Sequence, residues 1–90
     1  MKSKILLVED ERDLGNVVKQ YLEIMDFEVE WSLNGKNAYA TYAAAPANFD
    51  LLVIDVQLPG MNGFDLAGKI QQHNTDTPYL FLTARGEKKD

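Results

Sequence analysis

Two short stretches of this chain are continuously hydrophobic, and each of them ends in acidic residues. Residues 5–8 are followed by the acidic cluster 9–11, and residues 51–54 are followed by Asp55. An uninterrupted hydrophobic run of this length predicts a strand that is covered on both faces of a sheet. We therefore expect buried strands over residues 4–8 and 51–55.

The hydrophobic spacing elsewhere predicts three helices. One begins near Asp13 and has a single hydrophobic face with three- and four-residue spacing. That face consists of Leu14, Val17, Val18, Tyr21, Leu22 and Met25. A second helix is expected over 36–45, between the turn signal Asn34-Gly35 and Pro46, because proline cannot continue a helix interior. A third is expected over 64–72, with Phe64, Ala67 and Ile70 on one face.

Two further strands complete the pattern. Residues 28–31 alternate polar and apolar, as is typical of an edge strand, and residues 79–83 follow the break at Thr77-Pro78. The resulting βαβαβαβ order with short connections predicts a mostly parallel sheet with helices on both faces. Because parallel strands end at the same edge of a sheet, the cluster 9–11 and Asp55 are expected to form one site.

Composition narrows the class of protein. Ninety residues make at most one domain, and the net charge of −5 argues against direct contact with nucleic acid, which needs a basic surface. The absence of cysteine excludes disulfides and thiolate metal sites. The chain has no hydrophobic run long enough to span a bilayer and no signal-peptide pattern, so no membrane partner and a cytoplasmic location are expected.

The acidic residues are candidate metal ligands. Several carboxylates at one point repel one another, and a hard cation such as Mg²⁺ relieves that repulsion. The turn-rich loop 58–63 directs the backbone carbonyl of Gln57, which is a further candidate ligand for Mg²⁺. Thr83 ends the last strand, where its hydroxyl could hydrogen-bond a phosphoryl oxygen on Asp55. Taken alone, the cluster 9–11 could also be no more than the start of a helix.

Other features of the chain have simpler interpretations. Trp31 and the tyrosines are expected to be packing residues, and His73 lies in a polar stretch that suits the surface. The chain contains no P-loop, no Gly-x-Gly-x-x-Gly turn and no Ser-His-Asp set. Nucleotide binding and acyl transfer are therefore not supported.

In this order and spacing, the motifs resemble the receiver domain of two-component response regulators. The resemblance rests on ILLVEDE at 5–11, DLLVID at 50–55, LPGMNG at 58–63 and FLTA at 81–84. The first motif is most similar to receivers of the winged-helix transcription-factor class. The resemblance implies a flavodoxin-like, doubly wound α/β fold with strand order 2-1-3-4.

The resemblance also implies the chemistry. Asp55 would accept a phosphoryl group from the phosphohistidine of a histidine kinase. Asp10 would bind Mg²⁺ directly, Glu9 would bind it directly or through water, and the Gln57 carbonyl would complete the protein ligands. Thr83 would be the switch hydroxyl. The chain would then be a phosphoaccepting regulatory domain rather than an enzyme, within a transcriptional regulator.

The chain departs from this family at its C-terminal end. Receivers normally continue to a fifth strand with a lysine that contacts the phosphoryl group, and to two further helices. This sequence stops at Asp90, and Lys88 and Lys89 come too early to be that lysine. We therefore expect residues 1–90 to form a C-terminally incomplete receiver domain. The exposed fourth strand is expected to self-associate or to be completed by another chain.

Two other functions stay open. Aspartate-nucleophile phosphohydrolases also place an aspartate after an apolar strand, but they carry a second aspartate where this chain has Gln57. A receiver-like module that only binds or dimerises, without phosphorylation, would keep the same fold.

Overall fold

Strands and helices alternate along the chain in the computed structural model, which describes residues 2–73 and 76–82. The elements are β1 (Lys4–Val8), α1 (Arg12–Ile24), β2 (Glu28–Ser32), α2 (Gly35–Ala44), the 3-10 turn η1 (Pro46–Asn48), β3 (Leu51–Asp55), α3 (Gly63–His73) and β4 (Tyr79–Leu82). This order confirms the alternation that the hydrophobic pattern predicts. Among the described residues, none of the helices has the length and apolar character needed to cross a membrane.

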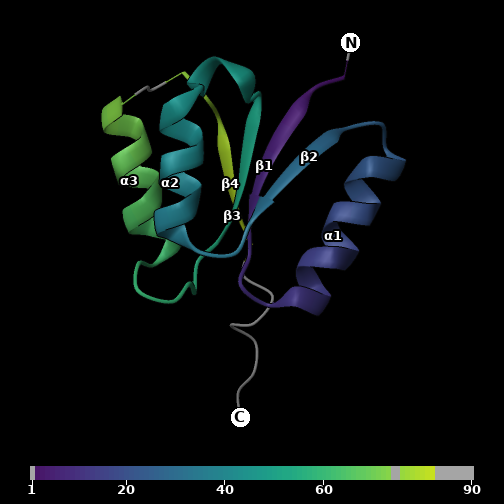
Figure 1. Cartoon of the computed structure of the whole chain (residues 1–90), viewed down its shortest axis with the longest axis horizontal. Coiled ribbons are helices and arrows are strands. Elements are labelled where there is room, and N and C mark those ends of the chain that lie inside the picture. The colour runs from purple at the N-terminus through teal and green to yellow at the C-terminus, as the bar shows by residue number, and fades with distance from the viewer. Residues whose placement is uncertain (1, 74–75, 83–90) are drawn as a thin grey trace.

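The four strands form one parallel sheet in the order β2-β1-β3-β4 (Figure 1). Val8 at the end of β1 pairs with Ser32 of β2 and with Ile54 of β3. Asp55 pairs with Leu82 of β4. The strands therefore finish at one level, which brings their carboxyl ends to one edge of the sheet. The strand order is the one expected for the flavodoxin-like fold.

The helices cover the two faces of the sheet unequally. Figure 1 shows α1 on one side and the pair α2 and α3 on the other. Successive side chains of a strand point to opposite faces, so Leu6 and Val8 of β1 pack in the α2 and α3 layer. Ile5 and Leu7 pack in the α1 layer. This two-sided burial explains why β1 is continuously hydrophobic.

Helix α1 buries only one side of its predicted hydrophobic face. Val18 and Leu22 pack against the sheet. Val17 and Tyr21, by contrast, are 63% and 61% exposed. Met25 follows the end of the helix and is also exposed. The predicted hydrophobic face of α1 is wider than the part of the sheet that the helix covers. Sequence spacing alone does not show which side of that face is buried.

Helices α2 and α3 each begin one residue before their expected start. Asn34 is the N-cap of α2, because its side-chain oxygen accepts a hydrogen bond from Asn37 N at 2.7 Å. Gly35 is therefore the first helical residue rather than part of a free turn. In α3, Ala67 and Ile70 are buried as expected, whereas Phe64 is exposed. The rings of Phe64 and Phe81 meet edge to face, with their centres 4.7 Å apart.

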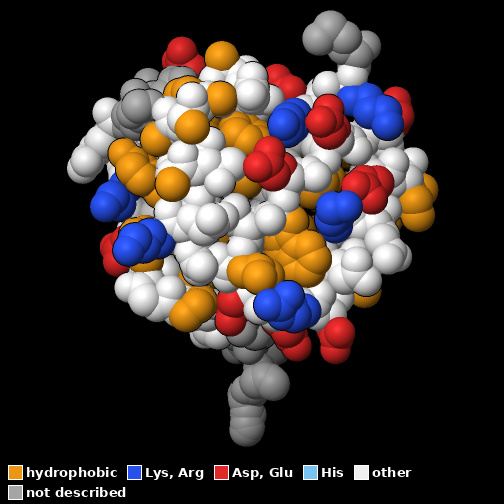
Figure 2. Space-filling model, in the orientation of Figure 1, with side chains coloured by type: hydrophobic (Ala, Val, Ile, Leu, Met, Phe, Trp, Pro, Cys, Tyr) orange, Lys and Arg blue, Asp and Glu red, His pale blue; other side chains and the backbone are white. Residues whose placement is uncertain are grey.

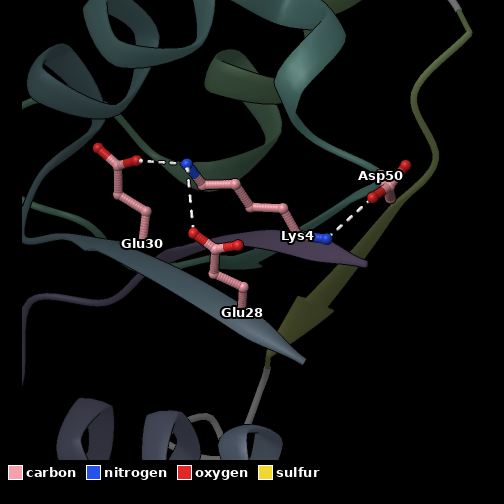
Figure 3. A network of polar contacts seen from close by, with 4 residues as sticks. All are labelled: Lys4, Glu28, Glu30 and Asp50. Atoms are coloured by element: carbon pink, nitrogen blue, oxygen red, sulfur yellow. Dashed lines mark hydrogen bonds and ion pairs between the residues drawn. The ribbon is translucent and has the colours of Figure 1, made fainter. Parts of the chain in front are cut away.

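Lys4 ties the amino ends of three strands together (Figure 3). Its ammonium group lies 3.3 Å from a carboxylate oxygen of Glu30 and 4.0 Å from one of Glu28, both on β2. Its backbone N–H donates to a carboxylate oxygen of Asp50, just before β3, at 2.8 Å. The backbone N–H of Asp50 in turn donates to the Lys4 carbonyl. These contacts hold the register of β1 with both neighbouring strands, at the end of the sheet opposite the cluster 9–11 and Asp55.

Candidate functional site

Glu9, Asp10 and Asp55 meet at the carboxyl end of the sheet. Each offers a carboxylate oxygen, and these oxygens all lie within 4.8 Å of one another. Glu9 is fully buried, Asp55 is 3% exposed and Asp10 is half-buried. Acidic side chains are also visible in Figure 2 at the lower edge, where the strands of Figure 1 end. The structure thus brings Asp55 together with Glu9 and Asp10 of the cluster 9–11, as the parallel sheet predicts, whereas Glu11 is exposed and is not part of this group.

The backbone of Glu9 is held by the end of β2. Its N–H donates to the carbonyl of Ser32 at 3.1 Å, which continues the ladder between β1 and β2. Its carbonyl oxygen accepts a hydrogen bond from the indole Nε1–H of Trp31 at 3.0 Å. The side chain folds back so that Oε2 accepts the N–H of Glu11 at 2.9 Å. The acidic loop between β1 and α1 is therefore anchored on both sides of Glu9.

Asp55 is the last residue of β3, between β1 and β4. Its Oδ1 accepts a hydrogen bond from the backbone N–H of Gln57 at 3.1 Å. The N–H of Val56 donates to the carbonyl of Leu82 at 3.3 Å, so the chain leaves the sheet only after Asp55. The local hydrogen bond fixes the rotation of the carboxylate at the strand end.

Gly63, the first residue of α3, is packed directly against the backbone of Asp55. A Cβ at Gly63 would lie 2.3 Å from the Asp55 carbonyl oxygen and 2.9 Å from the Cα of Val56. The N–H of Gly63 donates to the Val56 carbonyl at 2.8 Å. The side chain of Asn62 accepts the N–H of Asp65 at 2.8 Å, in the manner of a helix N-cap. The sequence predicts a turn here, but not this contact with the acidic site.

The other residues considered in the sequence analysis are Gln57, Thr83, Lys88, Lys89 and His73. Gln57 is exposed and contributes its N–H to Asp55, two residues away. Thr83 lies outside the described residues, as do Lys88 and Lys89. Helix α3 ends at His73, which places this histidine at the far end of the helix from Gly63 and Asp55.

The donor set suits a hard divalent cation. Mg²⁺ and Ca²⁺ take oxygen ligands, and the three converging side chains all supply carboxylate oxygen. Two of the three are buried, where the repulsion between like charges is stronger than in water. The residues present therefore fit Mg²⁺, and Glu9, Asp10 and Asp55 are the side chains that could hold it.

Comparison with known proteins identifies the family. The family model of the response regulator receiver domain matches residues 5–90. The transcriptional regulatory protein SrrA of Staphylococcus aureus is 38% identical over 88 residues, which make up 98% of this chain and 35% of SrrA. The chain thus spans about a third of the length of the curated relatives it matches.

Solved structures agree in fold. The non-phosphorylated HemR receiver domain of Leptospira biflexa is 45% identical, with a TM-score of 0.86 over 97% of this chain and 68% of that one. Response regulator TrrA of Thermotoga maritima, in complex with Mg(2+)-BeF, is 31% identical, with a TM-score of 0.87 over 97% of this chain and 76% of that one. These structures confirm the flavodoxin-like fold. The chain belongs to the family of response regulator receiver domains.

Proposed function

We propose that Asp55 accepts a phosphoryl group from the phosphohistidine of a histidine kinase, with Mg²⁺ bound beside it. The observation that carries this proposal is the convergence of Glu9, Asp10 and Asp55 at the carboxyl end of the sheet. Two structures of the relative TrrA support it, one in complex with Mg(2+)-BeF and one in complex with histidine kinase ThkA.

The three carboxylates have different roles in this proposal. Asp10 binds the metal directly, Glu9 binds it directly or through water, and the carbonyl of Gln57 adds a neutral oxygen. When bound, Mg²⁺ offsets the negative charge that accumulates as the phosphoryl group arrives. An Asp55 oxygen attacks phosphorus while the bond from phosphorus to the histidine nitrogen breaks. The electron pair of that bond stays on the nitrogen, and the histidine leaves as neutral imidazole because its other ring nitrogen carries a proton. The Gln57 N–H holds the Asp55 carboxylate in one orientation during this approach.

Thr83 is proposed as the hydroxyl that responds to phosphorylation. Leu82 pairs with Asp55 in the sheet, and Thr83 is the next residue of the chain. Replacement of Thr83 with alanine should leave phosphorylation of Asp55 intact and block the conformational response. Phosphorylation and response can be measured on one sample, by intact mass and by amide hydrogen exchange. Loss of phosphorylation itself would contradict this division of roles.

The proposed setting is a cytoplasmic transcriptional regulator in which another part of the protein contacts DNA. The similarity to SrrA supports this setting. The phosphohydrolase alternative is disfavoured, because the position two residues after the nucleophile is Gln57 rather than a second acid. Glutamine cannot exchange a proton as that acid/base residue does.

A second proposed role is association through β4. This strand is the last in the described sheet order, and its Leu80 is 58% exposed. An unpaired apolar edge is a template for a further strand. We propose that additional polypeptide, from the same protein or from a second chain, covers this edge.

The phosphoacceptor can be tested with a small phosphodonor such as acetyl phosphate. The full-length protein should gain one acid-stable, base-labile phosphoryl group that depends on Mg²⁺. Asp55→Asn should abolish it, and the matched variant Asp65→Asn, at an exposed carboxylate on α3, should not. Undiminished labelling of Asp55→Asn would overturn the assignment.

A further inference from the structure

Trp31 makes a contact that packing alone does not require. Its indole N–H donates to the carbonyl oxygen of Glu9 at 3.0 Å, although the two residues are 22 positions apart in the sequence. The next residue of β2, Ser32, accepts the N–H of the same Glu9. The last two residues of β2 therefore hold both backbone polar groups of one candidate metal ligand.

The indole ring has little freedom to move. Gly15 of α1 lies directly against it, and a Cβ at Gly15 would fall 2.1 Å from one ring carbon and 2.5 Å from another. The N–H of Gly15 donates to the Glu11 carbonyl at 2.9 Å, so the same turn of α1 continues into the acidic loop. The indole of Trp31 thus lies against α1, with its single polar atom directed at the acidic loop.

The hydrogen bond from Trp31 is accepted by the peptide group that joins Glu9 to Asp10. A peptide group is planar, so holding its carbonyl oxygen also fixes the N–H and the two flanking Cα atoms in the same plane. The side chains of Glu9 and Asp10 leave from those two Cα atoms. Rotation of this peptide plane would move both carboxylates relative to Asp55.

We propose that Trp31 is a positioning residue for the magnesium site, and that its indole N–H sets the plane of the Glu9–Asp10 peptide. The inference rests on the proposed function, because it assumes that these carboxylates bind Mg²⁺. The sequence predicts only a packing role for Trp31, and the inference adds a positioning role to it.

A pair of variants separates the N–H from the ring. Trp31→Phe keeps an aromatic side chain at this position and removes the donor. Val29→Ala, on the same strand and in the same hydrophobic cluster, weakens packing but leaves the indole N–H in place. Both variants should lower the thermal midpoint of the full-length protein, and that shared loss reports the structural role alone.

Magnesium affinity, measured by calorimetry well below the thermal midpoints, reports the positioning role. Trp31→Phe should weaken binding by about three- to tenfold, the usual weight of one hydrogen bond. Val29→Ala should bind as the unsubstituted protein does. Unchanged affinity in Trp31→Phe, or equal losses in the two variants, would overturn the inference.

A second measurement needs no metal. In the metal-free protein, the backbone amide of Asp10 belongs to the peptide held by Trp31, so Trp31→Phe should shift its NMR signal and speed its hydrogen exchange. Val29→Ala should leave both unchanged, and an Asp10 amide unaffected by Trp31→Phe would overturn the inference. If the amide responds as expected but the unsubstituted protein binds no Mg²⁺, the proposed function fails and the role of Trp31 toward a metal fails with it.

Discussion

The first residue of α3, Gly63, touches the main chain of the proposed phosphoacceptor, Asp55. A Cβ on Gly63 would lie 2.3 Å from the Asp55 carbonyl oxygen, which is far inside van der Waals contact. The obstructing atoms belong to backbone, so they cannot turn aside as a flexible side chain could. Glycine at this position therefore allows α3 to begin against the end of β3.

Gly63→Ala should consequently destabilise the protein by about 1–3 kcal/mol, the usual cost of inserting a methyl group where backbone must shift. Gly68→Ala is the matched control in the same helix, because a Cβ there would meet nothing within 4 Å. It should stabilise the protein by roughly 1 kcal/mol through helix propensity. Chemical denaturation measures both, and equal effects of the two substitutions would show that the contact with Asp55 is unimportant.

Magnesium binding should depend on Asp10 far more than on Glu11. Asp10 offers an oxygen to the acidic cluster, whereas Glu11 contributes its backbone N–H to Glu9. Asp10→Ala should therefore weaken Mg²⁺ binding by at least about tenfold, because affinity follows the number of charged ligands. Glu11→Ala keeps the backbone contact and should bind nearly normally.

Trp31 fluorescence is a suitable signal for this titration, since the indole N–H donates a hydrogen bond to the Glu9 carbonyl. Calorimetry would check that signal independently. Equal loss of binding in the Asp10 and Glu11 variants would mean that the wrong member of the acidic cluster has been assigned to the metal.

Asp26 adopts a backbone conformation that favours glycine. It follows the end of α1 with a φ of 74°, and its N–H donates to the Glu23 carbonyl at 3.0 Å. Asp26→Gly should raise the free energy of unfolding by about 0.5–1 kcal/mol, because glycine carries no Cβ to strain this conformation.

The substitution also removes an ion pair of 3.7 Å between Lys2 and Asp26, both largely exposed. Exposed pairs of this kind contribute little. Asp26→Ala removes the same ion pair but keeps the Cβ, so it should give no such gain. A thermal melt that ranked the alanine variant equal to the glycine variant would exclude relief of backbone strain as the cause.

Residues 1–90 taken alone should associate through β4. Leu80 exposes an apolar side chain on the last strand of the described sheet, and a charge introduced on such an edge discourages strand addition. Leu80→Lys should therefore lower the average mass seen by sedimentation across a concentration series. Ile24→Lys, at an exposed apolar residue on α1, should not. A cooperative, folded monomer at micromolar concentration in the unsubstituted chain would contradict this prediction.

Local patterns in the sequence predicted the helices and strands and placed the acidic residues at one edge of the sheet. The hydrophobic runs before Glu9 and Asp55 predicted two buried strands, and parallel strands end at one edge of a sheet, so both acidic positions were expected at that edge, where the structure has them. The order of the strands within the sheet came from the resemblance to receivers, because alternation of elements is compatible with several orders.

Only the tertiary structure decided which distant residues support that site. The donation from Trp31 to Glu9 and the approach of Gly63 to Asp55 depend on strand register and on how closely each helix lies on the sheet. The exposure of Val17 beside the buried Val18 depends on how far the sheet extends beneath α1. Periodicity reports which face of an element is apolar, but the partner on that face is set by packing between segments that are far apart in the chain.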